Sequence, residues 1–172
     1  MNKNLNEIIE SQKVLDKAIQ VKHHVNYDSV YDELKLALFV ELGELANEVR
    51  CFKFWSLKQP SEKDVILEEY VDGIHFISSL AIAKQVEINL KVNDINFSIN
   101  QDNTIPKNKK HLTKLFNSLF SKMHQLDSKE GITEWFNEYL SLGHSLGFSF
   151  KEISEAYFKK NQINFKRQNE NY

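Results

Sequence analysis

The sequence contains little cysteine, proline and glycine, and each shortage narrows the range of folds. One cysteine, Cys51, excludes an internal disulfide and a zinc site built from several cysteines. Two prolines and five glycines in 172 residues disfavour a turn-rich β fold and suit long helices. We therefore expect one all-α domain over residues 1–172, large enough to bury a core of its own.

Features of membrane and nucleic-acid binders are also lacking. No apolar run reaches the roughly 18 residues that a membrane-spanning helix needs. The chain begins with polar sequence instead of the apolar core of a signal peptide. A net charge of −2 gives no general case for binding nucleic acid or an anionic membrane. Together with the single cysteine, which fits a reducing compartment, these features predict a cytoplasmic protein that binds neither membranes nor nucleic acids.

Apolar residues recur at helical spacing through most of the chain, and no strand pattern competes with them. The predicted helices cover residues 4–22, 29–53, 62–90, 108–126, 131–145 and 150–168. Residues 91–106 are rich in Asn and Asp and are predicted to form a loop. Ser61 and Ser149 are predicted to cap the third and the last helix. The expected fold is an antiparallel bundle of about five to six helices.

Two acidic pairs lie in the second and third predicted helices. Glu41 and Glu44 form the first pair, and Glu69 and Asp72 form the second. The i, i+3 spacing places both carboxylates of a pair on one face of a helix, among apolar neighbours. Four carboxylates gathered in a helical core would be strongly unfavourable without a cation among them. The pairs therefore predict a site for Mg²⁺, with Mn²⁺ as a substitute, in a four-helix core, and a phosphate substrate.

Two other interpretations of the acidic residues stay open. Single Glu-x-x-Glu pairs are common on solvated helix faces, where they bind nothing. Asp72-x-x-His75 matches the carboxylate–histidine spacing of di-iron bundles, but no other histidine has a carboxylate three residues before it. His75 is therefore expected to be a polar residue near the site or a hydrogen-bonded core histidine.

The last predicted helix carries a polar face made of Lys160, Asn164 and Arg167. Their i, i+4, i+7 spacing places two cations and an amide side by side, which suits a polyphosphate. A basic last turn favoured by the helix dipole is the alternative explanation.

The acidic pairs resemble the metal signature of the all-α NTP pyrophosphohydrolases, the MazG-like superfamily. Three segments are similar to the dimeric dUTPases within it: ELGELANEVRCFKFW (41–55), LEEYVDGIHFISSL (67–80) and KNQINFKRQNENY (160–172). The tail departs from the family pattern at Asn171, where Gly is usual. The resemblance extends from the first helix to the tail.

This resemblance implies a homodimeric, magnesium-dependent dUTP diphosphatase. Its substrates would be deoxyuridine nucleotides, dUTP and also dUDP, converted to dUMP so that uracil in DNA is limited. Glu41, Glu44, Glu69 and Asp72 would hold the metal, with Glu41 or Glu44 as the catalytic base. The tail residues Lys160, Asn164 and Arg167 would bind the phosphates.

The resemblance also suggests residues for the base and the sugar. Trp55 and Gln12 would hold the uracil, since an amide both donates and accepts hydrogen bonds. Phe76 would press against the sugar, although an ordinary core role is the alternative. Asp16 lies where the family often has Asn. Two other functions stay open: an all-α pyrophosphohydrolase for dCTP or another nucleotide, and a helical interaction protein with vestigial acidic pairs.

Overall fold

Helices form all the regular secondary structure in residues 5–87 and 108–170, the part of the chain that the computed structural model describes. They are α1 (Leu5–His23), α2 (Tyr31–Val49), α3 (Lys63–Ala83), α4 (Lys109–Ser121), the 3₁₀ helix η1 (Met123–Asp127), α5 (Lys129–Ser145) and α6 (Phe150–Asn169). The described residues contain no strand, so the predicted all-α bundle is confirmed. The predicted loop 91–106 lies outside the described residues.

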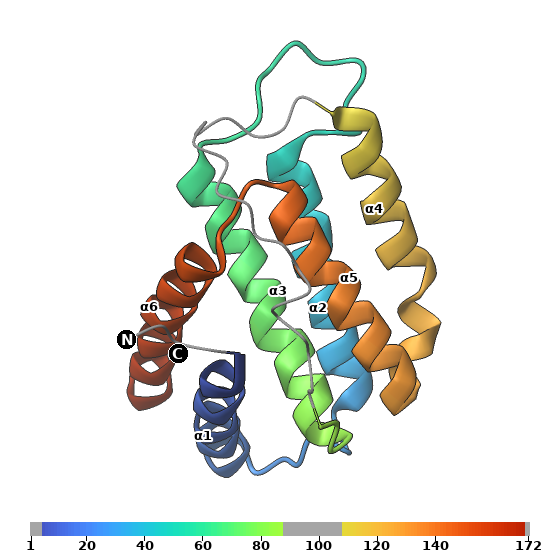
Figure 1. Cartoon of the computed structure of the whole chain (residues 1–172). Coiled ribbons are helices and arrows are strands. Elements are labelled where there is room, and N and C mark those ends of the chain that lie inside the picture. Colours follow the sequence, from blue (N-terminus) through green and yellow to red (C-terminus); the bar gives the residue numbers. More distant parts are fainter. Residues whose placement is uncertain (1–4, 88–107, 171–172) are drawn as a thin grey trace.

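The central helix is α3. It packs against α2, α5, α1 and α6, and α1 and α6 also pack against each other. Figure 1 shows α4 and α5 on one side of α3 and the pair α1 and α6 on the other. Because neighbours surround α3, its buried residues are distributed around most of the helix, which explains why its sequence is so apolar. A charged residue in this helix is therefore placed close to the core.

A pair of tyrosines joins α3 to α5. The rings of Tyr70 and Tyr139 are stacked with their centroids 4.7 Å apart. Each hydroxyl donates a hydrogen bond to the other residue's carbonyl oxygen, at 3.1 and 2.9 Å. Gly73 and Gly143 make room for them, because a Cβ atom would lie 2.1 Å from the Tyr139 hydroxyl at Gly73 and 2.4 Å from the Tyr70 hydroxyl at Gly143. This close packing fixes the middle of α3, which includes Asp72.

The predicted caps had different outcomes. Ser149 begins α6 with a capping box, in which its Oγ accepts from the Glu152 backbone N–H and its own N–H donates to the Glu152 carboxylate. The prediction for Ser61 was wrong. The N-cap of α3 is Glu62, which makes no side-chain cap bond, and the Ser61 hydroxyl donates to the carboxylate of Glu48 instead. A tertiary hydrogen bond thus replaces the expected local one.

The third helix is also shorter than predicted. It ends at Ala83, and Gln85 has a positive φ of 53°, which an α-helix cannot continue through. No helix in the described part of the chain combines the length and the apolar character needed to cross a membrane.

Candidate active site

Three of the four predicted metal-binding carboxylates meet where α2 faces α3. Glu41 comes from α2, and Glu69 and Asp72 come from successive turns of α3. One oxygen of each residue lies within 4.8 Å of the others, and all three side chains are partly buried. This spacing allows one cation to contact all three oxygens.

The fourth carboxylate, Glu44, lies beside this group. It is exposed and does not share the group of three oxygens. Three residues correspond to about 300° around an α-helix, so Glu44 is displaced by about 60° from Glu41 around α2. Its charge nevertheless helps to raise the pKa values of Glu41 and Glu69, which places it near the group.

The carboxylates destabilise one another's charged forms. Burial, followed by the negative charges of Asp72, Glu44 and Glu69, raises the pKa of Glu41 to about 7. Burial, followed by the charges of Asp72 and Glu44, also raises the pKa of Glu69. Burial raises the pKa of Asp72 as well, although a hydrogen bond from Lys160 opposes this rise. An all-oxygen, mutually repelling donor set of this kind fits a hard divalent cation.

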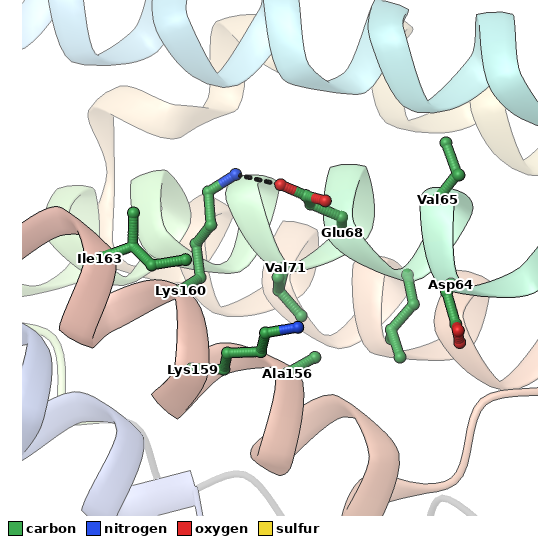
Figure 2. Close-up of a pocket in the computed structure, with 9 residues that line it drawn as sticks. Asp64, Val65, Glu68, Val71, Ala156, Lys159, Lys160 and Ile163 are labelled. Atoms are coloured by element: carbon green, nitrogen blue, oxygen red, sulfur yellow. Dashed lines mark hydrogen bonds and ion pairs between the residues drawn. The ribbon is translucent and has the colours of Figure 1, made fainter.

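Lys160 of α6 reaches this acidic group. Its Nζ lies 2.7 Å from Asp72 Oδ2 and 2.9 Å from Glu68 Oε1. Figure 2 shows the second of these contacts, with the lysine extending from α6 towards α3. Lys160 also borders a cavity of about 390 Å³ between α3 and α6, which is lined partly by Val71 and Ala156. This cavity is separate from the site cavity described next. The ammonium group therefore already lies against the acidic site.

A cavity of about 180 Å³ opens beside Glu41 and Asp72. It is lined by residues of α1, α2, α3 and α6, so these four helices form the predicted core around the site. Every residue predicted to bind substrate lines it except Trp55: Gln12, Phe76, Lys160, Asn164 and Arg167. Carboxylates, cations and apolar walls thus share one small space.

Gln12 does not present a free amide to this cavity. Its Nε2 donates to Asp16 Oδ1 at 2.7 Å and to Ser79 Oγ at 3.1 Å. Its Oε1 lies 2.7 Å from both His75 Nδ1 and the Tyr157 hydroxyl. An amide group has two N–H donors and two lone pairs, so all its hydrogen-bonding capacity is used within the protein. The structure thus gives Gln12 the role of fixing its neighbours.

Trp55 lies away from the cavity. It follows the end of α2 at Val49, whereas the cavity takes Leu34 and Glu41 from that helix. From Glu41 to Val49 the helix rises by about 12 Å. Trp55 is 66% exposed and contacts the rings of Phe52 and Phe54. Within one chain, it belongs to an exposed apolar segment.

His75 is the buried, hydrogen-bonded histidine that the sequence predicted, and Asp16 was named without a role, but sequence reasoning missed Ser79 and Tyr27 as polar residues of the cavity. Asp16 and His75 are 1% and 5% exposed, Ser79 is 3% exposed, and Tyr27 donates its hydroxyl to Asp16 Oδ1 at 3.0 Å. The signal was present in the sequence. Gln12 and Asp16 are polar residues one turn apart on the apolar side of the first helix, and His75 and Ser79 repeat this spacing in the apolar third helix.

Comparison with known proteins identifies the family of the chain. A family model described as dUTPase matches residues 4–172, almost the whole chain. A comparison with curated proteins gave no match. The family's enzymes are metal-dependent, and the structure provides an acidic group suited to a metal ion. The chain therefore belongs to the dUTPase family and is a dUTP diphosphatase.

Proposed function

We propose that the protein hydrolyses dUTP to dUMP and pyrophosphate with the help of Mg²⁺, and that it also accepts dUDP. The observation that carries this proposal is the position of the acidic group at the edge of a cavity. Glu41 and Asp72 line the same space as Lys160 and Arg167, so metal-binding and phosphate-binding groups face one substrate. In the cell, this reaction would limit uracil in DNA.

The metal would be held by Glu41, Glu69 and Asp72, with Glu44 beside them. Their three oxygens already lie within 4.8 Å of one another, and hard oxygen ligands favour Mg²⁺, with Mn²⁺ as a substitute. When bound, a divalent cation neutralises phosphate charge and makes a water molecule easier to deprotonate. Two or more ions would suit a triphosphate.

A carboxylate of the chain would accept the proton of the attacking water. Glu41 and Glu44 are the two candidates. Glu44 lies outside the group of three oxygens and is exposed, which supports it as the proton acceptor. Glu41 would then serve mainly to hold the cation.

The phosphates would lie against α6. The Lys160 ammonium lies 2.7 Å from Asp72, and Arg167 lines the cavity about two turns further along the same face of α6. Asn164 lies between them on this face, and its Oδ1 is 3.4 Å from Arg167 Nη1. Charge-assisted hydrogen bonds from the two cations would stabilise charge that develops on the phosphates.

The base and sugar would occupy the cavity itself. Phe76 supplies an apolar wall, and the buried network around Gln12 supplies polar atoms. At about 180 Å³, the cavity is smaller than the roughly 300 Å³ at which ordinary ligand pockets begin, so it fits part of a nucleotide. A pyrophosphohydrolase for dCTP is the competing assignment, because both pyrimidines have the size that such a cavity takes.

We also propose that the enzyme acts as a homodimer. The family resemblance supports this, and so does the segment that follows α2. Phe54, Trp55 and Leu57 are 93%, 66% and 97% exposed, which is unusual for neighbouring large apolar side chains. A second copy of the chain covering this segment would bury it and would bring Trp55 towards a base in the partner's cavity. A cytoplasmic location stays a prediction.

The test is a panel of nucleotides incubated with purified protein and Mg²⁺. Pyrophosphate release should be fastest from dUTP, and dUDP should yield dUMP and phosphate. Glu69→Gln should abolish both, whereas Glu134→Gln, an exposed change on α5, should leave them intact. Preference for dCTP would overturn the base assignment, and no release from any nucleotide would favour the interaction-protein interpretation.

A further inference from the structure

Two buried polar atoms at the wall of the cavity have no hydrogen-bond partner among the described residues. They are Asp16 Oδ2 and His75 Nε2. Both residues line the cavity, and the amide group of Gln12 joins them, because it is hydrogen-bonded to Asp16 Oδ1 and to His75 Nδ1. A buried polar atom without a partner is costly, and a ligand that supplies the missing bonds gains that energy.

Gln12 determines which nitrogen of His75 carries the proton. The carboxylate Asp16 accepts hydrogen bonds from Nε2 of Gln12, which fixes the orientation of the amide. Gln12 Oε1 therefore faces His75 Nδ1, and an oxygen that only accepts requires this nitrogen to be N–H. Burial, helped by the charge of Lys160, lowers the pKa of His75 to about 3, so the ring is neutral. Its Nε2 consequently keeps a lone pair that has no partner among the described residues.

The ring of His75 is also fixed in position. It stacks on Tyr157 with the centroids 4.3 Å apart, and the Tyr157 hydroxyl lies 2.7 Å from Gln12 Oε1. The lone pair therefore points in one direction, as an acceptor that is oriented before any ligand arrives.

The two oxygens of Asp16 have different surroundings. Oδ1 lies within hydrogen-bond distance of three donor groups, on Gln12, Tyr27 and Ser79, at 2.7, 3.0 and 2.9 Å. A proton on this carboxyl group therefore belongs on Oδ2, which has no hydrogen-bond partner among the described residues. Burial raises the pKa of Asp16 to about 6, and the three hydrogen bonds oppose the rise.

We propose that His75 and Asp16 read the edge of the pyrimidine as an acceptor beside a donor. His75 Nε2 accepts the N3–H of uracil, and the protonated Oδ2 of Asp16 donates to the carbonyl oxygen at C4. Asp16 thus takes up a proton when the base binds above neutral pH. This inference rests on the proposed function, because it assumes that the cavity holds the base of the substrate.

The chemistry of the two pyrimidines explains why this pair selects uracil. Uracil carries N3–H between two carbonyl oxygens, so an acceptor beside a donor matches it. Cytosine carries a lone pair at N3, which would face the lone pair of His75 Nε2. It also carries an amino group at C4, which would place a second donor against the protonated Oδ2 of Asp16. An ionised Asp16 would fit uracil poorly, because a buried carboxylate would then face a carbonyl oxygen without a proton between them.

Other charged groups share the lining of this cavity and contribute to its field. Beside Gln12, the groups bonded to Asp16 come from the segment after α1 and from α3: Tyr27 and Ser79. The remaining charged lining residues are Glu41 and Asp72, opposed by Lys160 and Arg167. Two carboxylates thus share the cavity with two cations. The Asp16→Asn exchange leaves these four groups unchanged, so it separates the titration of Asp16 from theirs.

The experiment is calorimetric titration of the enzyme with dUMP, with Mg²⁺ present throughout, in buffers of different ionisation enthalpy from pH 6 to 8.5. Asp16→Asn replaces the Oδ2 proton donor by an amide donor that does not titrate. On binding dUMP at pH 8, the wild type should take up about one proton more than Asp16→Asn. Its dissociation constant should rise about tenfold per pH unit above 7 relative to that of the variant.

Three controls separate the possible outcomes. Deoxyribose 5-phosphate, which lacks the base, should bind to the wild type without the extra proton, so the wild type alone answers the question if the variant fails to fold. Binding of dCMP should be at least about tenfold weaker than binding of dUMP. Three results would overturn the proposal. They are equal proton uptake by the wild type and a folded Asp16→Asn on binding dUMP, equal proton uptake by the wild type with dUMP and with deoxyribose 5-phosphate, and equal affinity of the wild type for dCMP and dUMP. If that happens while dUTP is still hydrolysed, the proposed function stands and only this inference fails.

Discussion

The carboxylates that would bind the metal repel one another when no metal is present, so they should lower the stability of the metal-free enzyme. We expect Glu41→Gln to raise the free energy of unfolding in EDTA at pH 8. Burial and three nearby carboxylates raise the pKa of Glu41 from 4.5 to about 7, so its ionised form is disfavoured in the folded state. Glutamine keeps the shape of the side chain and removes the charge.

The magnitude follows from this shift. At about 1.4 kcal/mol per pKa unit, the full rise corresponds to about 3 kcal/mol. Glu41 is only partly buried, so solvent screens part of the repulsion, and we expect a gain of about 1–2 kcal/mol. A raised carboxyl pKa costs stability as pH rises. The two proteins should therefore be equally stable below pH 4.5, and their difference should grow between pH 4.5 and 7 and then stay constant.

Urea unfolding in EDTA at several pH values measures this difference, with Glu134→Gln as a matched change at an exposed position of α5. Mg²⁺ should then stabilise the wild type by mass action and should stabilise Glu41→Gln far less. The reasoning is refuted if Glu41→Gln is no more stable than the wild type at pH 8 in EDTA, or if their difference does not change with pH.

Three further predictions concern other parts of the protein. Gly143→Ala should lower the free energy of unfolding by about 1–3 kcal/mol in thermal or urea unfolding, because its Cβ would lie 2.4 Å from the Tyr70 hydroxyl. Gly43→Ala is the control, because its Cβ would meet open space and should raise the free energy of unfolding by up to about 1 kcal/mol. Equal effects of the two changes would contradict the close packing. Lys160→Gln should raise KM for dUTP at least about tenfold in steady-state kinetics, since a charge-assisted phosphate contact is lost, and an unchanged KM would remove Lys160 from the site. Trp55→Ala should leave the Tm of this exposed position nearly unchanged but weaken dimerisation in light scattering and raise KM; a dimer of unaltered strength and an unchanged KM would argue against the proposed contact.

Local patterns in the sequence were sufficient to predict most of the fold. Helical periodicity located all six α-helices of the described residues, and Ser149 caps the last helix as predicted. Ser61 failed because a cap depends on competition with tertiary partners, here the carboxylate of Glu48. The positive φ of Gln85, which ends the third helix early, has no signal as clear as a glycine or a proline.

The site was predictable where its geometry comes from a single helix. The i, i+3 spacing correctly brought Glu69 and Asp72 together, and the i, i+7 spacing did the same for Lys160 and Arg167. They could not show that Glu44 stays outside the group of three oxygens, because that depends on how α2 is rotated against α3. The sequence also could not show that the hydrogen-bonding groups of Gln12 are all used within the protein, because its partners His75 and Tyr157 come from two other helices.

Titration of the metal-free enzyme with Mn²⁺, followed by the electron paramagnetic resonance of the free ion, tests the central claim most directly. The wild type should bind Mn²⁺, and Glu69→Gln should bind it far more weakly while unfolding at a similar or higher temperature in EDTA, since a repelling charge has been removed. Equal Mn²⁺ binding by the wild type and Glu69→Gln would contradict the assignment of the acidic group as the metal site of this dUTPase.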